Sequence, residues 1–316
     1  MRRYLAGRAL QAVFVLWAAF TLTFVVLYLL PSDPVSIMLD PGGQGSYVDP
    51  AQVAALRARY HLDQSMPVQY AAMLGDAVRG DFGTSITTGA PVLLLIFQAL
   101  PETLKLAGSA LLLALVAGVG IAFLATYTRV AWLRQFLLGL PPLGISVPTF
   151  WVGLLLVQVL SFRLPVFPAM GNQGLRSLVL PAVTLAVPTT AVIAQLLAKS
   201  LDMTWGQPYV ETAWAKGATR LHVQARHVFR NAVIPTLTMV GLTVGNLVAG
   251  SVVVETVFSR NGIGRLTQQA VEAQDIPVVQ GLVVFAAVVF VATNLLVDLI
   301  YPLVDPRIAH TPSPSR

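Results

Sequence analysis

Six long apolar runs dominate the pattern of hydrophobic and polar positions along the chain. An α-helix rises about 1.5 Å per residue, so about 20 apolar residues cross the roughly 30 Å hydrocarbon core of a bilayer. Each run therefore predicts one membrane-spanning helix, and the fold class is an all-α membrane protein with six spans. The runs cover residues 9–30, 104–126, 136–160, 178–198, 234–257 and 278–300.

The first run differs from a cleaved signal peptide, although Arg2, Arg3 and Arg8 precede it. Its apolar stretch is longer than a signal-peptide core of about 7–15 residues. No small-x-small cleavage site follows at Leu29-Leu30-Pro31. We therefore expect an uncleaved first span.

Composition excludes most soluble classes. The 316 residues are 56% hydrophobic and only 11% charged, with a mean hydropathy of +0.73. A soluble domain carries roughly 25% charged residues, because its exposed surface must stay hydrated. A soluble enzyme, a nucleic-acid-binding protein and a disordered scaffold are all poor interpretations of this composition.

The net charge of +6 is explained by topology rather than by a nucleic-acid partner. Lys and Arg concentrate in cytoplasmic loops of membrane proteins. With a cytoplasmic N-terminus, twelve basic residues fall inside and four in the short outer loops, which predicts that both termini are cytoplasmic. The inner residues are Arg2, Arg3, Arg8, Arg129, Arg134, Lys199, Lys216, Arg220, Arg226, Arg230, Arg307 and Arg316; the outer ones are Arg163, Arg176, Arg260 and Arg265.

A long segment, residues 31–103, lies outside the membrane in this topology. Asp49-Pro50 is typical of a helix start and predicts a helix through Tyr60, and a second helix is predicted over 67–78. Three glycines, Gly80, Gly83 and Gly89, then interrupt the chain. We expect a small ordered cap; the alternative is a simple tether.

The connection over residues 199–233 is cytoplasmic in this topology and mixes basic residues with exposed aromatic positions. Pro208 predicts the start of a helix that continues through Lys216, with Gly217 as its stop. A second helix is predicted from Leu221 to Ala232, ending before Pro235. Such a hairpin is typical either of a partner-docking element or of an amphipathic element lying on the membrane surface.

Catalytic and metal-binding motifs are missing from the sequence. The chain has no cysteine and no HExxH, and the five-residue separation of His222 and His227 places them on different faces of an α-helix. Ser146, Ser161 and Ser251 lie in or near spans without a basic partner nearby, and such serines usually bond to their own helix backbone. A phosphate-binding loop needs Gly before Lys, whereas the three lysines follow Leu, Ala and Ala. We expect no ATP hydrolysis and no bound metal or cofactor in this chain.

A stand-alone secondary transporter is a different-class alternative, because such proteins carry ionisable groups at membrane depth. The acidic and basic residues near spans all lie close to predicted ends, which favours interfacial positions: Glu102, Lys105, Glu255 and Asp298. Asn246 and Asn294 are deeper. Several glycines predict close helix packing, and four prolines predict kinks lining a cavity. They are Gly118, Gly120, Gly139, Gly153, Gly241, Gly245 and Gly250, and Pro141, Pro148, Pro181 and Pro188.

The hairpin resembles the EAA loop of permease subunits of binding-protein-dependent ABC importers, and it looks most like the dipeptide, oligopeptide and nickel branch. The resemblance rests first on residues 209–213, Lys216-Gly217, Arg226-His227, residues 230–232 and Pro235. It extends over nearly the whole chain. The further segments that carry it are 30–34, 80–85, 148–153, 255–258, 262–266, 277–281 and 305–307.

This resemblance implies a type I permease fold and a coupling role for the hairpin. The residues implied to contact an ATPase subunit are Glu211, Thr212, Ala213, Trp214, Lys216 and Gly217. Thr212 replaces the motif's first alanine, and an alternative role for Glu211 is a salt bridge within the hairpin. The resemblance leaves the substrate path unassigned.

The resemblance also implies partners and a location. The implied partners are a second homologous permease, two ATPase subunits that bind ATP and Mg, an extracytoplasmic substrate-binding protein and a peptide substrate. The location is the cytoplasmic membrane of a prokaryote. Nickel chelate, glutathione or another small solute is the alternative cargo. The predicted organisation is a first span within 1–30, an outer segment 31–103, a permease core 104–308 with the hairpin 199–233, and a disordered tail 309–316.

Overall fold

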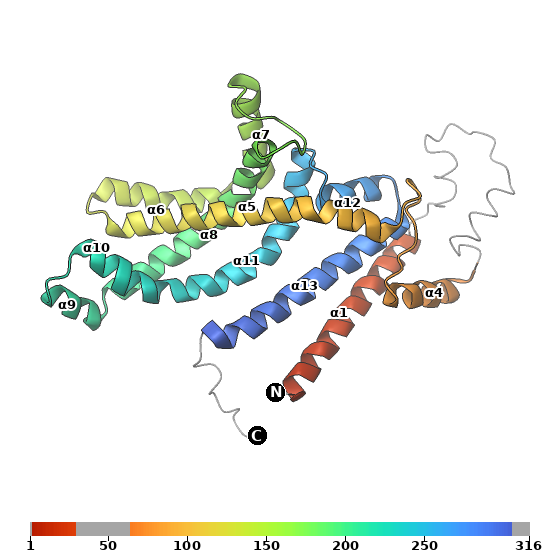
Figure 1. Cartoon of the computed structure of the whole chain (residues 1–316), viewed down its shortest axis with the longest axis horizontal. Coiled ribbons are helices and arrows are strands. Elements are labelled where there is room, and N and C mark those ends of the chain that lie inside the picture. The colour runs from red at the N-terminus through yellow and green to blue at the C-terminus, as the bar shows by residue number, and fades with distance from the viewer. Residues whose placement is uncertain (1, 30–63, 305–316) are drawn as a thin grey trace. The chain divides into compact units, whose positions relative to one another are not determined.

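The computed structural model describes the backbone of residues 2–29 and 64–304 (Figure 1). Regular structure in these ranges is helical, apart from an isolated antiparallel bridge between Thr84 and Pro91. The helices are α1 (Arg2–Leu29), α4 (Met66–Val78), α5 (Val92–Tyr127), α6 (Ala131–Ser146), α7 (Thr149–Val157), η1 (Gln158–Arg163), α8 (Arg176–Trp205), α9 (Pro208–Ala215), α10 (Arg220–His222), η2 (Val223–Val228), α11 (Phe229–Val257), α12 (Ile263–Glu272) and α13 (Ile276–Val304).

Four helices among the described residues are long and apolar enough to cross a membrane unbroken: α1, α5, α8 and α13. Two bent helix pairs bring the number to as many as six if each pair is one span. Each of these segments overlaps one of the six predicted runs. Helix α5 starts at Val92, well before the predicted position 104, and continues through Pro101.

The predicted third span, 136–160, is not one straight helix. It is divided into α6 and α7, which meet at an angle of 103° around Val147 and Pro148. Proline disfavours helical backbone in the residue before it, and Val147 accordingly has an extended conformation with φ −89° and ψ 128°. The kink predicted at Pro148 is thus present, but it divides the apolar run into two helices where the run predicts one span.

The predicted end of the second hairpin helix before Pro235 is wrong. Helical backbone runs from Arg220 through the π-helical turn η2 into α11, which contains Pro235. A proline removes one backbone hydrogen bond, and a membrane helix tolerates that loss where neighbouring groups compensate it. The pair of helical segments 220–241 and 243–257 is bent by 48°.

The helix predicted over 67–78 is confirmed as α4, with Ser65 before it and Pro67 in its first turn. Gly80, Gly83 and Gly89 all have positive φ, at 82°, 76° and 69°, as expected for breaks in the chain. Tyr70 of α4 packs its ring edge-on against Phe24 of α1. The predicted helix over 50–60 and the predicted tail 309–316 lie outside the described residues.

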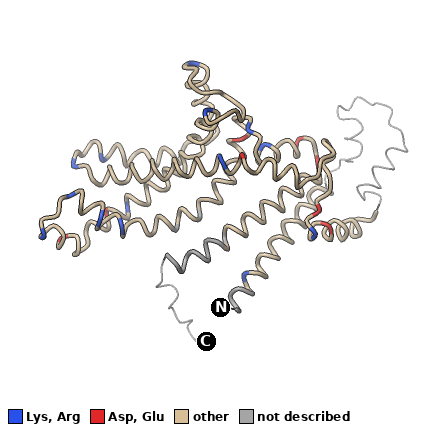
Figure 2. Tube along the Cα trace, in the orientation of Figure 1, with Lys and Arg blue, Asp and Glu red and all other residues tan. Residues whose placement is uncertain are grey.

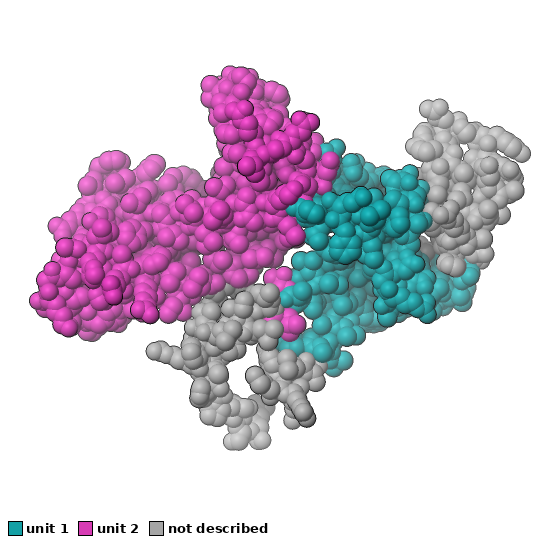
Figure 3. All heavy atoms as spheres, viewed as in Figure 1, with its two compact units in different colours: residues 1–101, 262–292 teal, residues 102–261, 293–316 magenta. Residues whose placement is uncertain are grey.

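The chain divides into two compact units (Figure 3). Unit 1 comprises residues 1–101 and 262–292, and unit 2 comprises residues 102–261 and 293–316. Unit 1 buries Val92 and Ile96 from the start of α5 together with Val278 and Leu282 of α13. Helix α12 lies where the sequence predicts an outer loop, and it adds Ala270 to this core.

Asp275 joins two segments of unit 1 that are almost 200 residues apart. Its buried carboxylate accepts hydrogen bonds from the Ser85 hydroxyl at 2.6 Å and the Thr87 hydroxyl at 2.9 Å. A buried carboxylate is costly unless hydrogen bonds compensate its lost hydration. Segment 80–85, part of the family resemblance, is therefore held to the residue that precedes α13.

Replacing Gly281 with alanine is expected to destabilise unit 1. A Cβ at this position would lie 2.5 Å from Val92 Cγ1, inside van der Waals contact. Overpacking of this kind costs about 1–3 kcal/mol, so the variant should melt at a lower temperature in detergent when followed by tryptophan fluorescence. Gly245→Ala is the matched control, because nothing lies within 4 Å of its added Cβ. Equal melting temperatures for the two variants would contradict the close packing.

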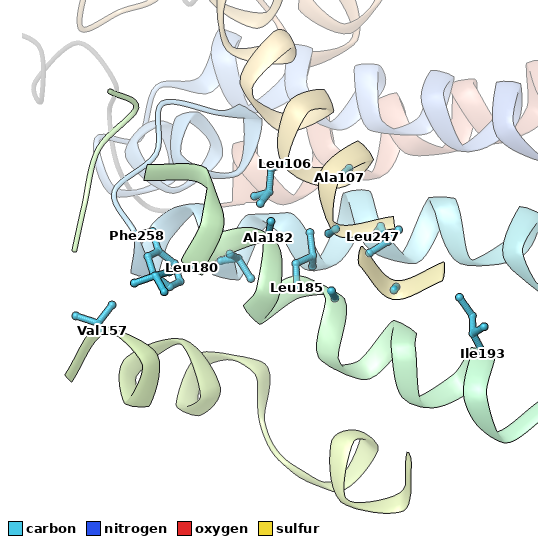
Figure 4. Packing of buried hydrophobic residues seen from close by; sticks show 13 residues of the cluster. Leu106, Ala107, Val157, Leu180, Ala182, Leu185, Ile193, Leu247 and Phe258 are labelled. Carbon is cyan, nitrogen blue, oxygen red and sulfur yellow. The ribbon is translucent and has the colours of Figure 1, made fainter. Parts of the chain in front are cut away.

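Unit 2 is built around α8, which is packed by α5, α6, α7 and α11. Its core joins Leu106 of α5, Leu180 and Leu185 of α8, and Phe258 after α11 (Figure 4). The prediction of close packing is confirmed at Gly118, where an added Cβ would lie 2.8 Å from Ile193, and at Gly153 and Gly250. Gly120, Gly139 and Gly245 have open space around them.

An ionic cluster ties one end of unit 2 together. The buried Arg260 donates to Glu102 at 2.7 Å and to the carbonyl groups of Gly171 and Ser177 at 3.3 and 3.2 Å. Glu102 also pairs with Lys105 at 2.7 Å. Glu255 is fully buried near the end of α11 and accepts from the Thr103 hydroxyl at 2.6 Å. The interfacial placement of these groups stays a prediction.

Candidate coupling site

A helical hairpin follows the long helix α8. Helix α8 ends at Trp205, and Gln207 has an extended backbone that sets the start of α9 at Pro208. Proline suits this first position because its missing N–H has no partner there anyway. The predicted start is therefore confirmed. Several basic positions lie along this end of the trace (Figure 2).

Gly217 ends α9 as predicted. Its φ is +79°, a left-handed conformation that favours glycine. Its N–H donates to the Trp214 carbonyl at 2.8 Å, and the Ala218 N–H donates to the Ala213 carbonyl at 3.3 Å. This pair of bonds is the Schellman motif, which satisfies carbonyl groups at the end of a helix. Lys216 lies at the boundary, one residue beyond the last residue of α9.

Helix α9 has a buried and an exposed face. Val210 and Ala213 are buried among Leu197 and Leu201 of α8 and Val228 of η2. The opposite face is open, with Tyr209 exposed by 41% and Trp214 by 43%. Helical spacing of buried positions on one side thus holds α9 on unit 2 and leaves its other side available for a partner.

The structure separates the six predicted coupling residues into two groups. The side chains of Glu211, Thr212, Trp214 and Lys216, like Gly217, are exposed, whereas Ala213 is only 8% exposed. Ala213 therefore contributes close packing to its own chain rather than surface. Glu211 lies in the first turn of α9, and no ion-pair partner lies within reach of it among the described residues. The salt bridge considered for Glu211 within the hairpin is thus absent from the described part of the chain.

Two side chains tether the second half of the hairpin, and sequence reasoning missed the roles of both. Gln224 is completely buried in η2 and donates to the Phe123 carbonyl at 2.8 Å and to the Thr126 hydroxyl at 3.0 Å. Asn231 donates to the Tyr209 hydroxyl at 2.9 Å. Polar residues in a polar loop carry no sequence signal that distinguishes a buried tether from a solvated side chain.

The prediction that His222 and His227 face different sides is wrong. Their ring centroids lie 5.7 Å apart. Residues 223–228 form the π-helical turn η2, and in a π-helix side chains about five positions apart lie on the same side. Within the described residues, no group of three or more His, Cys, Asp or Glu side chains forms a candidate metal site.

Two of the three span serines bond to their own helix as predicted. Ser146 donates to the Pro142 carbonyl at 2.8 Å and Ser251 to the Val248 carbonyl at 2.7 Å. The buried Ser161 hydroxyl has no hydrogen-bond partner in the part of the chain that the structure describes. Of the prolines predicted to line a cavity, Pro141 borders an apolar hollow of about 320 Å³ between α5, α6 and α8.

Comparison with known proteins decides the family. Residues 110–310 match the family described as the inner membrane component of binding-protein-dependent transport systems, and residues 1–107 match the N-terminal part of such components. The chain belongs to this family. It is a permease subunit of a binding-protein-dependent ABC importer and an inner-membrane protein.

Relatives and solved structures agree with this assignment. The permease is 34% identical to the oligopeptide transport system permease protein AppB of Bacillus subtilis. The match covers 98% of the permease and 100% of AppB. The permease is 33% identical to the glutathione transport system permease protein GsiC of Escherichia coli, with the same coverage. A structure of the inward-facing MetNI methionine ABC transporter matches 67% of the permease and 96% of that chain, with a TM-score of 0.56 and 19% identity, which shows a shared fold.

Proposed function

We propose that the permease forms half of the translocation path of an ATP-driven importer for di- and oligopeptides, and that the hairpin of residues 199–233 couples it to an ATPase subunit. The observation that carries the coupling role is the two-sided helix α9. One face is buried against α8, and the other presents Glu211, Thr212 and Trp214. A force applied to the exposed face is thereby transmitted to a helix long enough to cross the membrane.

The proposed complex contains a second homologous permease, two ATPase subunits and an extracytoplasmic substrate-binding protein. Support comes from the family description, which names a binding-protein-dependent transport system. The three lysines of the chain lack a preceding glycine, so we assign ATP and Mg binding to the partner subunits. Nucleotide-driven closure of these subunits would bias the spans between outward-open and inward-open states.

The proposed topology has six spans and both termini in the cytoplasm. It is supported by twelve basic residues on the inner side against four in the short outer loops. In this topology α9 lies in the cytoplasm, where an ATPase is accessible. The segment 31–103 lies outside, where we propose that it meets the substrate-binding protein.

Peptides are the proposed cargo because the relative AppB is named as an oligopeptide transport permease. Glutathione, itself a small peptide derivative, is the second candidate because GsiC is named as a glutathione transport permease. Both relatives match the permease at nearly the same identity, so sequence identity does not distinguish the two cargoes. Transport measurements are needed to distinguish them.

Uptake by the complete importer in proteoliposomes tests this function. Labelled di- and oligopeptides, presented with the substrate-binding protein, should accumulate with ATP and Mg on the ATPase side and not with a non-hydrolysable ATP analogue. Unlabelled peptide should compete more strongly than glutathione. Stronger competition by glutathione or a nickel chelate would reassign the cargo. Uptake by the permease alone, without an ATPase, would contradict the importer mechanism and indicate a secondary transporter.

A further inference from the structure

We propose that a cavity beside the α5–α6 turn binds an anionic phospholipid. The cavity has a volume of about 510 Å³ and lies wholly within unit 2. It is formed where α5 ends and α6 begins, next to the first residue of α10. Its lining residues are Leu124, Tyr127, Thr128, Arg129, Leu133, Leu137 and Arg220.

Two arginines give the cavity a positive charge that nothing in its lining balances. Arg129 is exposed and has no hydrogen-bond or ion-pair partner within the described residues. Arg220 donates to the Thr126 carbonyl at 3.3 Å, and its buried Nε lacks a hydrogen-bond partner in the same part of the chain. No acidic residue lines the cavity. Guanidinium groups are suited to binding phosphate oxygens.

The rest of the wall is apolar and belongs to membrane helices. Leu133 and Leu137 are one turn apart on α6, and Leu124, exposed by 55%, faces them from α5. A free phosphate or an acidic protein side chain would use only the arginines. A phospholipid uses both the charged and the apolar part of the wall, because its phosphate contacts the guanidinium groups while its acyl chain covers the leucines.

The neighbouring surface is also that of a membrane interface. Trp132, on the same helix, is exposed by 69%, and tryptophan side chains concentrate at the membrane–water boundary. The inference rests on the proposed topology in one respect, since that topology places the cavity at the cytoplasmic leaflet. Basic pockets between membrane helices on that side are suited to anionic headgroups.

The lipid would contact the base of the coupling hairpin. Arg220 follows Gly217 by three residues and lies over the rings of Tyr127 and Trp205, each at 5.6 Å. Trp205 is the last residue of α8. A phosphate on Arg220 would therefore hold together the end of α5, the end of α8 and the start of α10.

Lipid retention by the complete importer tests the site. Complexes equilibrated in nanodiscs of phosphatidylcholine, with or without phosphatidylglycerol, are released into detergent and their bound lipids are counted by native mass spectrometry. We expect phosphatidylglycerol to be retained in preference to phosphatidylcholine. Arg129→Gln should weaken this retention about tenfold, as expected for one lost charge-assisted hydrogen bond. Arg134→Gln is the matched control, because Arg134 pairs with Asp202 at 3.0 Å and does not line the cavity.

A second variant separates a lipid from a soluble anion. Leu137→Trp keeps both arginines but fills the space assigned to the acyl chain, so it should also reduce phosphatidylglycerol retention. Unchanged retention in Arg129→Gln or in Leu137→Trp would overturn the proposal. So would displacement of the lipid by glycerol phosphate at equal concentration, or crosslinking of a photoreactive group at Leu133 to an ATPase subunit. These readouts require no transport, so a failure of the lipid site is distinguishable from a failure of the importer function.

Discussion

Replacing Gly217 with proline is expected to abolish ATP-driven uptake while the permease still inserts in the membrane. Gly217 has φ +79°, whereas proline is restricted to about −65°. Proline also lacks the N–H that donates to the Trp214 carbonyl at 2.8 Å. The turn that orients α9 is therefore lost, but the spans are not directly altered. The measurement is peptide uptake by the reconstituted importer, together with the amount of permease in the vesicles.

Two further glycine variants separate backbone conformation from bulk. Gly217→Ala meets no atom within 4 Å, so its cost is the left-handed backbone alone, about 1–2 kcal/mol, and uptake should be partly retained. Gly206→Ala is the matched control at the other end of the hairpin, where φ is −81° and the nearest atom is 3.8 Å away. It should transport normally. Normal uptake by Gly217→Pro would contradict a coupling role for the hairpin.

A variant on the exposed face of α9 tests the coupling role without disturbing the fold of the hairpin. Glu211→Gln preserves the size of the side chain, and Glu211 has no ion pair to lose among the described residues. Its melting temperature should match that of the unaltered permease, whereas the ATPase activity stimulated by substrate should fall. A change in melting temperature without a change in ATPase stimulation would indicate a structural role instead.

Replacing Arg260 with methionine is expected to cause the largest loss of stability, about 3 kcal/mol. Its side chain is only 3% exposed, and its guanidinium pairs with Glu102 at 2.7 Å. Removing one partner of a buried ion pair leaves the other charge uncompensated, which costs about 3–5 kcal/mol. Glu102 is 21% exposed and keeps Lys105 as a second partner, so we expect the lower end of this range.

The comparison is made with unfolding titrations of the purified permease in detergent micelles. Arg79→Met is the control, because the Arg79–Asp76 pair is exposed and such pairs contribute only about 0–1 kcal/mol. The double variant Arg260→Met with Glu102→Gln should recover part of the lost stability, since no unpaired carboxylate remains. Equal losses of unfolding free energy in Arg260→Met and Arg79→Met would show that the buried pair stabilises the permease no more than the exposed pair does.

Local rules were sufficient for much of this protein. The length and apolarity of the runs determined the helical class and the positions of the long helices, because a membrane helix satisfies its own backbone. Pro208 and Gly217 determined the ends of α9, since proline fixes its own φ at a helical value and glycine adopts the left-handed conformation that ends a helix. The resemblance to the family followed from motifs spread over nearly the whole chain.

Tertiary structure alone decided how these pieces are oriented and joined. The π-helical turn brings His222 beside His227, and burial against α8 turns Ala213 away from the partner-facing surface. Asp275 meets Ser85 across 190 positions of the chain. The last two features depend on contacts between separate helices or loops, and the first depends on a π-helical turn in place of an α-helical one. Residue spacing read with α-helical periodicity carries no information about either. The sequence by itself thus determined the class, the family and the local turns, and packing determined which side chains face inward.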